Sequence, residues 1–510
     1  MKKKPAKLIK KKPAKRWAKK KDIPAPVRTS YPVNDTQRAQ RFAKKYANES
    51  KYVQAWKQWL LWNGVRWVPD EDGAVFRKAQ EIPKLLLKEA AEIKDDDRRK
   101  KAAGAAIRAG DRSKLEAMIK LAECQSEIAA SPTLFDSDPY LLGVSNGVVD
   151  LRTGKFRQAR KEDHITKQAG VAYDPNATCP LWEKSLSRWL AEDTELISFV
   201  QRSVGYSLTG DISEQCLFFL YGTGQNGKST FIECTHPLLG TYAAKASPTL
   251  YTLNRWGTEP ETEIARLKGT RLAAGSETEE GARLAESRVK DITGGDTLRG
   301  RELYCPAFSF LPTHKLWIYG NHLPDIRGND DGIWRRIKLI PFEVKIPDQE
   351  KDPKLLEKLL KELPGILNWA IQGCVQWQRR GLGTPATVIE ATTEYREEED
   401  EIGEFITEKC TCAGQVERSE LHSAYRSWAE DRGVRMPMTT KAFAKRLRVR
   451  PGITELKSNG RRYWNGISLA ASSCRVSLRN GVSPLEVWKS EYDQFSQAGG
   501  HVGQQIRLFA

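Results

Sequence analysis

The chain has 510 residues and a formal net charge of +18, and 39% of its residues are hydrophobic. Its length exceeds what one hydrophobic core supports, so we expect two to four domains. No apolar stretch approaches membrane-spanning length, and no hydrophobic region follows the charged amino terminus, so we expect neither a membrane span nor a secretory signal. Nine cysteines without a C-x-x-C pair argue against structural zinc and are typical of a reducing cytoplasm.

The amino-terminal segment 1–22 is predicted to be a disordered basic tail. Residues 1–21 contain eleven lysines, one arginine and no acid, and Lys-Lys-Lys-Pro-Ala-Lys occurs twice. Such a tail is attracted to the phosphate backbone of nucleic acids, and we favour that interpretation over a solvated tail or a targeting signal.

Residues 23–135 are predicted to be mainly helical. Four aromatic residues recur near helical spacing, Tyr52, Trp56, Trp59 and Trp62. Aromatic side chains can stack on bases, but we favour a role in the core. The charge-rich run 94–99 predicts a solvated helix face rather than a metal site.

Short strands are expected in 136–205, a domain that precedes the core, where Asn146-Gly147 is a hairpin signal and Thr153-Gly154 a turn. Residues 206–345 alternate between apolar strand-like runs and helical segments. This alternation is typical of an α/β fold with a parallel sheet and crossover helices.

The most informative motif is the run Gly222-Thr223-Gly224-Gln225-Asn226-Gly227-Lys228-Ser229, which matches the P-loop pattern at every required position. An apolar run, 216–221, precedes it and predicts a buried parallel strand. In such a loop the backbone N–H groups bind phosphates, and here the binding segment extends from Gly222 to Thr230. Lys228 would reach the β- and γ-phosphates and Ser229 would bind Mg²⁺. The motif predicts binding of a nucleoside triphosphate with Mg²⁺.

Hydrolysis also requires an acid and a polar group near the γ-phosphate. A strand of small residues, 271–276, is followed by Glu277, the expected Walker B carboxylate and second Mg²⁺ ligand, with Glu279 as the alternative. Another buried-strand run, 315–320, ends at Asn321. An asparagine at that end of a central strand can orient the attacking water.

An arginine that stabilises the transition state is the last group expected, and the pair Arg335-Arg336 offers two candidates. Either arginine alone would more often be an ordinary surface residue. The order and spacing of these segments behind a complete P-loop favour a catalytic function.

The remaining chain divides into a helical extension, 346–414, a small module, 415–469, and a segment of unknown role, 470–510. A basic helix followed by a hairpin predicts a winged-helix domain that binds DNA. Its candidate DNA contacts are Lys441, Lys445, Arg446, Arg461 and Arg462.

The motif set resembles that of the superfamily three helicases, in particular the phage and plasmid primase-helicase group that includes poxvirus and satellite-phage replication proteins. The resemblance covers about 40–469. Its segments are Asn146-Gly147, the P-loop, Ser276-Glu277-Thr278-Glu279, Thr293-Gly294-Gly295-Asp296, Pro312-Thr313-His314-Lys315-Leu316, Asn321-His322-Leu323-Pro324 and Trp334-Arg335-Arg336.

The resemblance implies an AAA+-like core that assembles into a homo-oligomeric, hexameric ring with ATP sites between subunits. Arg335 or Arg336 would then reach a neighbour's site. A hairpin between Gly295 and Pro312 would line the pore, with Arg299 and Arg301 as phosphate contacts. Members of the group often carry a basic residue at the hairpin tip, whereas the expected tip here reads Tyr304-Cys305-Pro306.

We therefore expect an ATP-dependent replicative DNA helicase of a phage, plasmid or integrated element, in the cytoplasm of a bacterial host. It would use ATP and Mg²⁺ and move 3′ to 5′ on single-stranded and forked DNA, with a separate primase or other replication proteins as further partners. We expect no primase activity, because 1–135 is short and helical. The alternatives are an ATP-switched origin-binding protein and a DNA-packaging ATPase.

Overall fold

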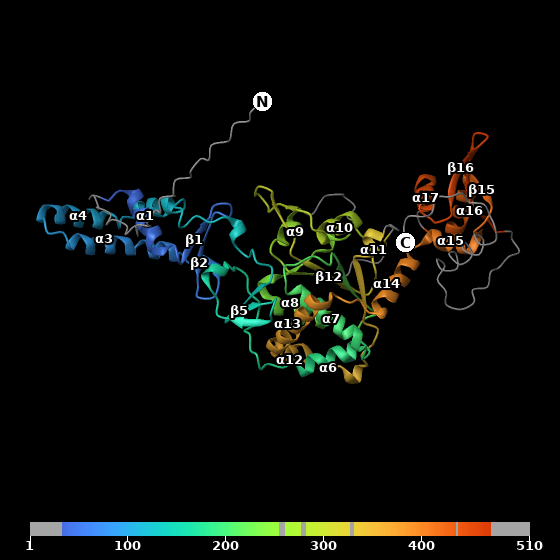
Figure 1. The fold of residues 1–510 in the computed structure, drawn as a ribbon, viewed down its shortest axis with the longest axis horizontal. Helices are drawn as coiled ribbons and strands as arrows, with labels where there is room; N and C mark the ends of the chain where they lie inside the picture. Colours follow the sequence, from blue (N-terminus) through green and yellow to red (C-terminus); the bar gives the residue numbers. More distant parts are fainter. Residues whose placement is uncertain (1–32, 254–260, 277–281, 327–330, 435–436, 471–510) are drawn as a thin grey trace, which may run out of the picture. The chain divides into compact units, whose positions relative to one another are not determined.

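The computed structural model describes residues 33–253, 261–276, 282–326, 331–434 and 437–470 (Figure 1). These residues form two compact units. The first comprises the described residues of Met1–Leu61 and Pro69–Pro132, and the second those of Trp62–Val68 and Thr133–Ala510. The basic tail 1–22, the acids Glu277 and Glu279, and the segment 471–510 lie outside the described residues. None of the described helices is long and apolar enough to cross a bilayer.

The first unit is mainly helical, as predicted, around a core that includes Phe42, Ile82 and Met118. Its helices are α1 (Asp35–Tyr46), α2 (Ala74–Ala79), α3 (Glu81–Ala91), α4 (Asp96–Arg108) and α5 (Arg112–Ala122). Asn34 and Gln37 form a capping box at the start of α1. The charged run 94–99 starts α4 and is mostly exposed, so the prediction of a solvated helix face is confirmed.

The aromatic residues predicted to lie along a helix instead form a hairpin, so that prediction was wrong. Strands β1 (Ser50–Val53) and β2 (Gln58–Trp62) pair antiparallel, with Tyr52 opposite Trp59. Tyrosine, tryptophan and valine favour strands, and Lys57 adopts a left-handed φ of 52° at the turn. The core interpretation holds for Tyr52, which is buried, whereas Trp56, Trp59 and Trp62 are half-buried.

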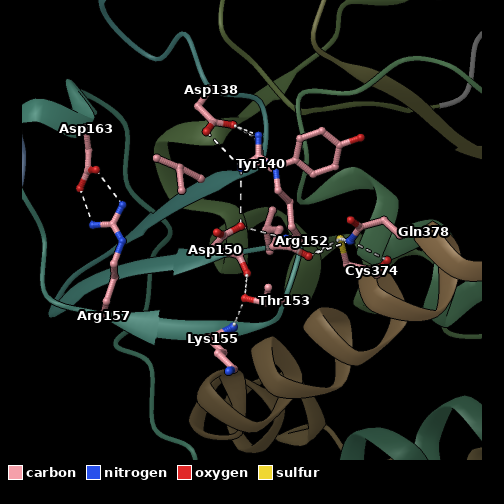
Figure 2. A network of polar contacts seen from close by, with 12 residues as sticks. Asp138, Tyr140, Asp150, Arg152, Thr153, Lys155, Arg157, Asp163, Cys374 and Gln378 are labelled. Atoms are coloured by element: carbon pink, nitrogen blue, oxygen red, sulfur yellow. Dashed lines mark hydrogen bonds and ion pairs between the residues drawn. The ribbon is translucent and has the colours of Figure 1, made fainter.

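The boundary between the two units falls within β3 (Trp67–Pro69), whose first residue is buried. The second unit contains a small antiparallel sheet of β4 (Leu141–Val144), β5 (Gly147–Asp150) and β6 (Lys155–Arg157). The hairpin predicted at Asn146-Gly147 is confirmed. Figure 2 shows Arg152 directed at Asp138, to which it donates two hydrogen bonds. The side chain of Gln378 donates to the carbonyl oxygen of Leu151 (2.7 Å). The bond of Gln378 joins the end of β5 to helix α13 (Leu363–Arg380).

A five-stranded parallel sheet is the centre of the second unit, which confirms the predicted α/β fold with a parallel sheet. Its strand order is β13-β7-β12-β9-β8. The strands are β7 (Leu217–Tyr221), β8 (Ala243–Lys245), β9 (Leu272–Ser276), β12 (Lys315–Gly320) and β13 (Ile337–Pro341). The predicted strands 216–221, 271–276 and 315–320 correspond to β7, β9 and β12.

Both faces of this sheet are covered, because alternate residues of its three central strands belong to different hydrophobic clusters. Phe218 and Trp317 pack into one cluster, and Phe219 and Ile318 pack into the other. The surrounding helices are α6 (Pro180–Trp189), α7 (Thr194–Ser207), α8 (Lys228–Leu239), α9 (Glu261–Arg266), α10 (Glu286–Thr293), α11 (Asp331–Trp334), α12 (Leu355–Lys361), α13 and α14 (Ala386–Glu398). A sheet buried on both faces explains the continuous apolar runs of its strands.

The carboxyl-terminal module has its own core, which includes Phe405, Trp428 and Trp464. Its elements are α15 (Glu401–Lys409), β14 (Cys410–Thr411), β15 (Gln415–Glu417), α16 (Arg418–Asp431), α17 (Thr440–Leu447), β16 (Thr454–Ser458), β17 (Arg461–Asn465) and β18 (Ser468–Leu469). Because Ile402, Phe405 and Ile406 of α15 belong to this core, the module begins near residue 401 rather than at 415, and the predicted extension 346–414 ends too late.

Candidate nucleotide-binding and hydrolysis site

The P-loop lies at the carboxyl end of β7, between the neighbouring strands β12 and β13. The carboxyl edge of a parallel sheet is where such folds bind ligands. Helix α8 begins at Lys228, directly after the loop, with Gly227 at its N-cap. Because glycine has no side chain to cap the helix, the first N–H groups of α8 can point at an anion.

Left-handed backbone conformations give the loop its shape. Gly224, Gln225 and Gly227 have φ values of 99°, 54° and 89°. A Cβ atom at Gly227 would overlap the indole of Trp189, so only glycine fits there. Successive N–H groups in such a loop form a concave site for phosphate.

The Lys228 side chain connects the loop to a neighbouring strand. It is 5% exposed, and its Nζ donates hydrogen bonds to the carbonyl oxygen of Gly222 (2.7 Å), to Asn226 Oδ1 (3.0 Å) and to Asn321 Oδ1 (3.1 Å). Asn226 in turn donates to the carbonyl oxygen of Phe342 (2.6 Å). The ammonium group is therefore held in position before any phosphate is bound.

The strand register explains why Lys228 and Asn321 meet. Gly320, the last residue of β12, pairs with Tyr221, the last residue of β7, so Asn321 and the P-loop leave the sheet side by side. On the other side of β12, Tyr319 pairs with Ser276 at the end of β9. The structure thus brings together two of the predicted site residues, and Glu277, which follows Ser276 in the sequence, lies outside the described residues.

These residues fit a nucleoside triphosphate with Mg²⁺. The glycine-rich cradle offers backbone donors, Lys228 supplies a fixed positive charge, and the Ser229 hydroxyl is exposed on the first turn of α8. Thr223, Gln225 and Thr230 are also at least partly exposed around the loop. Within the described residues, no cluster of three or more histidine, cysteine or acidic side chains forms a separate metal site.

The candidate arginines lie at the amino-terminal ends of the strands, whereas the P-loop lies at their carboxyl-terminal ends. Leu217, the first residue of β7, donates its N–H to the carbonyl oxygen of Arg336 (2.8 Å). Five residues of β7, roughly 16 Å of strand, separate this edge from the P-loop. The structure therefore does not bring Arg335 or Arg336 to the P-loop of their own chain.

The hairpin predicted between Gly295 and Pro312 is present. Strands β10 (Leu298–Gly300) and β11 (Phe308–Phe310) pair antiparallel, with Arg299 opposite Ser309. Arg299 and Arg301 are exposed. Their contact with DNA stays a prediction.

The candidate DNA contacts of the carboxyl-terminal module fall on one helix and one hairpin. Lys441 and Lys445 are exposed on α17, and Arg446 is half-buried. Arg461 and Arg462 are exposed on β17, but Arg461 pairs with Glu417 (3.2 Å) and Arg462 lies 3.7 Å from Glu455. Acidic neighbours thus partly neutralise the hairpin arginines.

Sequence reasoning missed the residues that hold the P-loop from outside. Trp189, the last residue of α6, packs against Gly227, and Phe342 follows β13 and accepts from Asn226. The backbone N–H of Ile346 also binds the carbonyl oxygen of Gln225 (2.9 Å). The amphipathic pattern of 180–189 signals a packed helix, but no local signal indicates what Trp189 contacts.

Comparison with known proteins gives two family matches. Residues 39–190 match "D5 N terminal like", and residues 220–336 match a family of unknown function, DUF5906. The chain is 28% identical over 334 residues to "Putative helicase L207/L206" of Acanthamoeba polyphaga mimivirus, covering 60% of this chain and 35% of that protein. It is 26% identical over 323 residues to "Putative primase C962R" of African swine fever virus (isolate Tick/Malawi/Lil 20-1/1983), covering 58% and 33%.

Among solved structures, the chain is similar to the apo C-terminal region of NrS-1, with a TM-score of 0.46 and 10% identity over 84% of this chain and 98% of that one. The chain spans about a third of the length of the viral relatives above. The relatives are named for helicase or primase function. Parts of the chain are thus similar to the D5 N-terminal-like family and to proteins of large DNA viruses that are named as helicases or primases.

Proposed function

We propose that the chain is an ATP-dependent DNA helicase that serves the replication of a virus or mobile element. The observation that carries this proposal is the hydrogen bond between Lys228 of the P-loop and Asn321 after β12, at the carboxyl edge of the parallel sheet. It joins a phosphate-binding cation to a polar group that can orient water. The viral relatives named as helicases support the proposal that the energy of ATP hydrolysis is used to unwind DNA.

The roles of the described residues follow from their chemistry. The N–H groups of the loop and of the first turn of α8 bind the phosphates, and Lys228 neutralises charge on the β- and γ-phosphates. Ser229 and, by the sequence pattern, Glu277 or Glu279 would hold Mg²⁺, which would supply further positive charge to the phosphates. Asn321 orients the attacking water, and its bond to Lys228 fixes its amide beforehand.

Of the two arginines, Arg335 is the better candidate for a finger in a neighbouring site. It is exposed, whereas Arg336 is only 9% exposed and donates to the carbonyl oxygen of Gly332 (2.6 Å). A guanidinium group at the amino edge of the sheet cannot serve its own P-loop. We therefore propose a ring, with six subunits as the resemblance implies, in which each ATP site is completed by the next subunit.

The carboxyl-terminal module would hold DNA as a winged helix. The order α15, β15, α16, α17, β16, β17, with β17 between the other two strands, supports this proposal. In such a domain a helix enters the major groove and the hairpin contacts the backbone. The same module would also suit the alternative, an origin-binding protein that uses ATP as an assembly switch.

Location, polarity and partners are proposed on the sequence pattern. The named relatives are viral, so a bacterial host stays a prediction, as do 3′ to 5′ movement and a separate primase. One relative is named a primase, and a template-dependent primer-synthesis assay would test our expectation that this chain makes no primers.

The test is strand displacement on forked DNA with ATP, comparing wild type with Lys228→Ala. Lys228→Ala removes the ammonium group that acts on the reacting phosphates, so it should lower ATP turnover about 100- to 1,000-fold and abolish unwinding. DNA binding without ATP should be preserved, because the lysine contacts no predicted DNA-binding residue.

The matched control is Lys245→Ala, which removes an exposed lysine from the edge strand β8 of the same sheet and should leave both activities unchanged. Substrates tailed only 3′ or only 5′ report polarity. ATP-dependent DNA binding without displacement would favour the assembly switch, and wild-type unwinding by Lys228→Ala would refute the site.

A further inference from the structure

The β10–β11 hairpin ends in two exposed apolar side chains. Leu303 is 73% exposed and Tyr304 is fully exposed, at 101% of its reference area. The N–H of Cys305 binds the carbonyl oxygen of Glu302 (3.1 Å), so Leu303 and Tyr304 are the central residues of a tight turn. The two adjacent side chains form a small exposed apolar surface at the apex of the hairpin.

The backbone at the apex is also unfavourable for its residue. Tyr304 has a φ of 61°, in the left-handed region where glycine or asparagine is usual and a bulky residue is rare. Glycine would satisfy this turn at no cost. An aromatic side chain in such a strained position points to a function of the side chain itself.

The base of the hairpin is anchored, so the apex is presented on a firm support. A Cβ atom at Gly300 would overlap Ala265 of α9, and the N–H of Arg301 binds the carbonyl oxygen of Glu261 (3.2 Å). The Lys268 ammonium lies 4.8 Å from the centre of the Phe308 ring. Arg301 Nε also donates to the carbonyl oxygen of Cys305 (3.3 Å), which braces the turn.

We propose that Tyr304 stacks on a base of single-stranded DNA, with Leu303 beside it and with Arg299 and Arg301 at the adjacent phosphates. This inference rests on the proposed helicase function. In the group that the chain resembles, a basic residue is common at the hairpin tip, whereas here an aromatic residue would contact the DNA. Aromatic stacking combined with nearby cations is how sequence-independent single-strand binding works.

Single-stranded DNA is favoured over a protein partner for two reasons. The same hairpin exposes Arg299 and Arg301 near the apex, which suits phosphates. The apolar apex consists of two adjacent side chains, whereas a stable protein interface needs about 800 Å² on each partner. Contact with a second copy of the chain is the alternative that the experiment must separate.

The experiment measures the concentration of oligothymidylate that half-saturates the ATPase, for wild type, Tyr304→Gly and Tyr304→Phe. Glycine suits the backbone of this turn, so loss of function in Tyr304→Gly reports the missing ring rather than a collapsed hairpin. We expect Tyr304→Gly to need about 5- to 150-fold more DNA, with its basal ATPase unchanged, and Tyr304→Phe to resemble wild type.

An oligonucleotide with abasic sites at every position isolates the stacking. Wild type should bind it more weakly than oligothymidylate by the factor that Tyr304→Gly loses, and Tyr304→Gly should bind the two strands alike. The proposal would be overturned if Tyr304→Gly lost the same factor of affinity for the abasic strand as for oligothymidylate. It would also be overturned if sedimentation showed that Tyr304→Gly no longer forms the wild-type oligomer. No DNA stimulation of the wild type would instead refute the helicase function itself.

Discussion

His314 is a buried titratable residue directly before β12. It is 3% exposed, and burial, together with the charge of Lys315, lowers the pKa of His314 to about 3 from its usual 6.5. The neighbouring Lys315 is 1% exposed and donates to the carbonyl oxygens of Thr209, Asp211 and Thr313. The folded chain therefore holds His314 neutral at the amino end of the strand that leads to Asn321.

The pKa of His314 predicts acid sensitivity of this strand. Between pH 6.5 and about 3 the unfolded chain binds a proton that the folded chain does not, so the stabilisation is complete above pH 6.5 and is lost as the pH falls. From pH 7.5 to 5 this residue should cost about 2 kcal/mol of local stability. Hydrogen exchange of the β12 amides should show this loss in wild type and not in His314→Gln.

The control for this prediction is His322→Gln, which changes the exposed histidine just beyond the other end of β12. It should retain the wild-type pH dependence. The same pH dependence in His314→Gln as in wild type would show that another group is responsible.

At the level of single residues, the sequence predicted what is local. The P-loop glycines and Lys228 follow from a pattern whose spacing is dictated by phosphate geometry. Asn321 was found because it ends an apolar strand. The contact of Trp189 with Gly227 was not foreseen, because the two are 38 positions apart and only packing joins them.

At the level of elements, fully buried strands were the most predictable. The runs that became β7, β9 and β12 are apolar in their central residues because both faces of the sheet are covered. The hairpin β1–β2 was mistaken for a helix because its aromatic residues fall at a spacing that both structures allow. The strand propensity of these residues and the turn near Lys57 favour the hairpin over the helix.

Helix α17 carries a prediction about salt dependence. Lys441 and Lys445 are four residues apart on an exposed face of the helix and would contact two phosphates. Lys441→Ala with Lys445→Ala should weaken binding to all duplex sequences alike. It should also reduce the slope of log affinity against log salt by about 2.

The control for this measurement is Lys409→Ala, at the exposed end of α15 in the same module. Its slope should equal that of wild type. An unchanged slope in the α17 double variant would mean that this helix does not contact DNA.

At the level of the whole molecule, the parallel sheet separates the candidate catalytic residues into two sets. Lys228 and Asn321 lie at its carboxyl edge, and Arg335 and Arg336 precede β13 at its amino edge. Parallel strands cannot bring opposite edges together within one subunit. The sequence alone left the choice of arginine open, because exposure of Arg335 and burial of Arg336 are tertiary properties.

This separation predicts complementation between two inactive variants. Arg335→Ala retains a complete P-loop, and Lys228→Ala retains the arginine. In a head-to-tail ring assembled from equal amounts of both, about one quarter of the interfaces would join an intact lysine to an intact arginine. We expect each variant alone to hydrolyse ATP about 100-fold or more below wild type, and the mixture to recover measurable turnover.

Mixtures of Arg336→Ala with Lys228→Ala test the assignment of the finger. Arg336 is buried and donates to the carbonyl oxygen of Gly332, so Arg336→Ala should lower the stability of the folded subunit. Mixing Arg336→Ala with Lys228→Ala should not restore ATP hydrolysis in the way that Arg335→Ala does. Sedimentation must show that the variants still assemble. If the Arg335→Ala mixture forms rings yet stays as inactive as its components, then arginine and lysine do not act across a subunit interface, and the shared-site model is wrong.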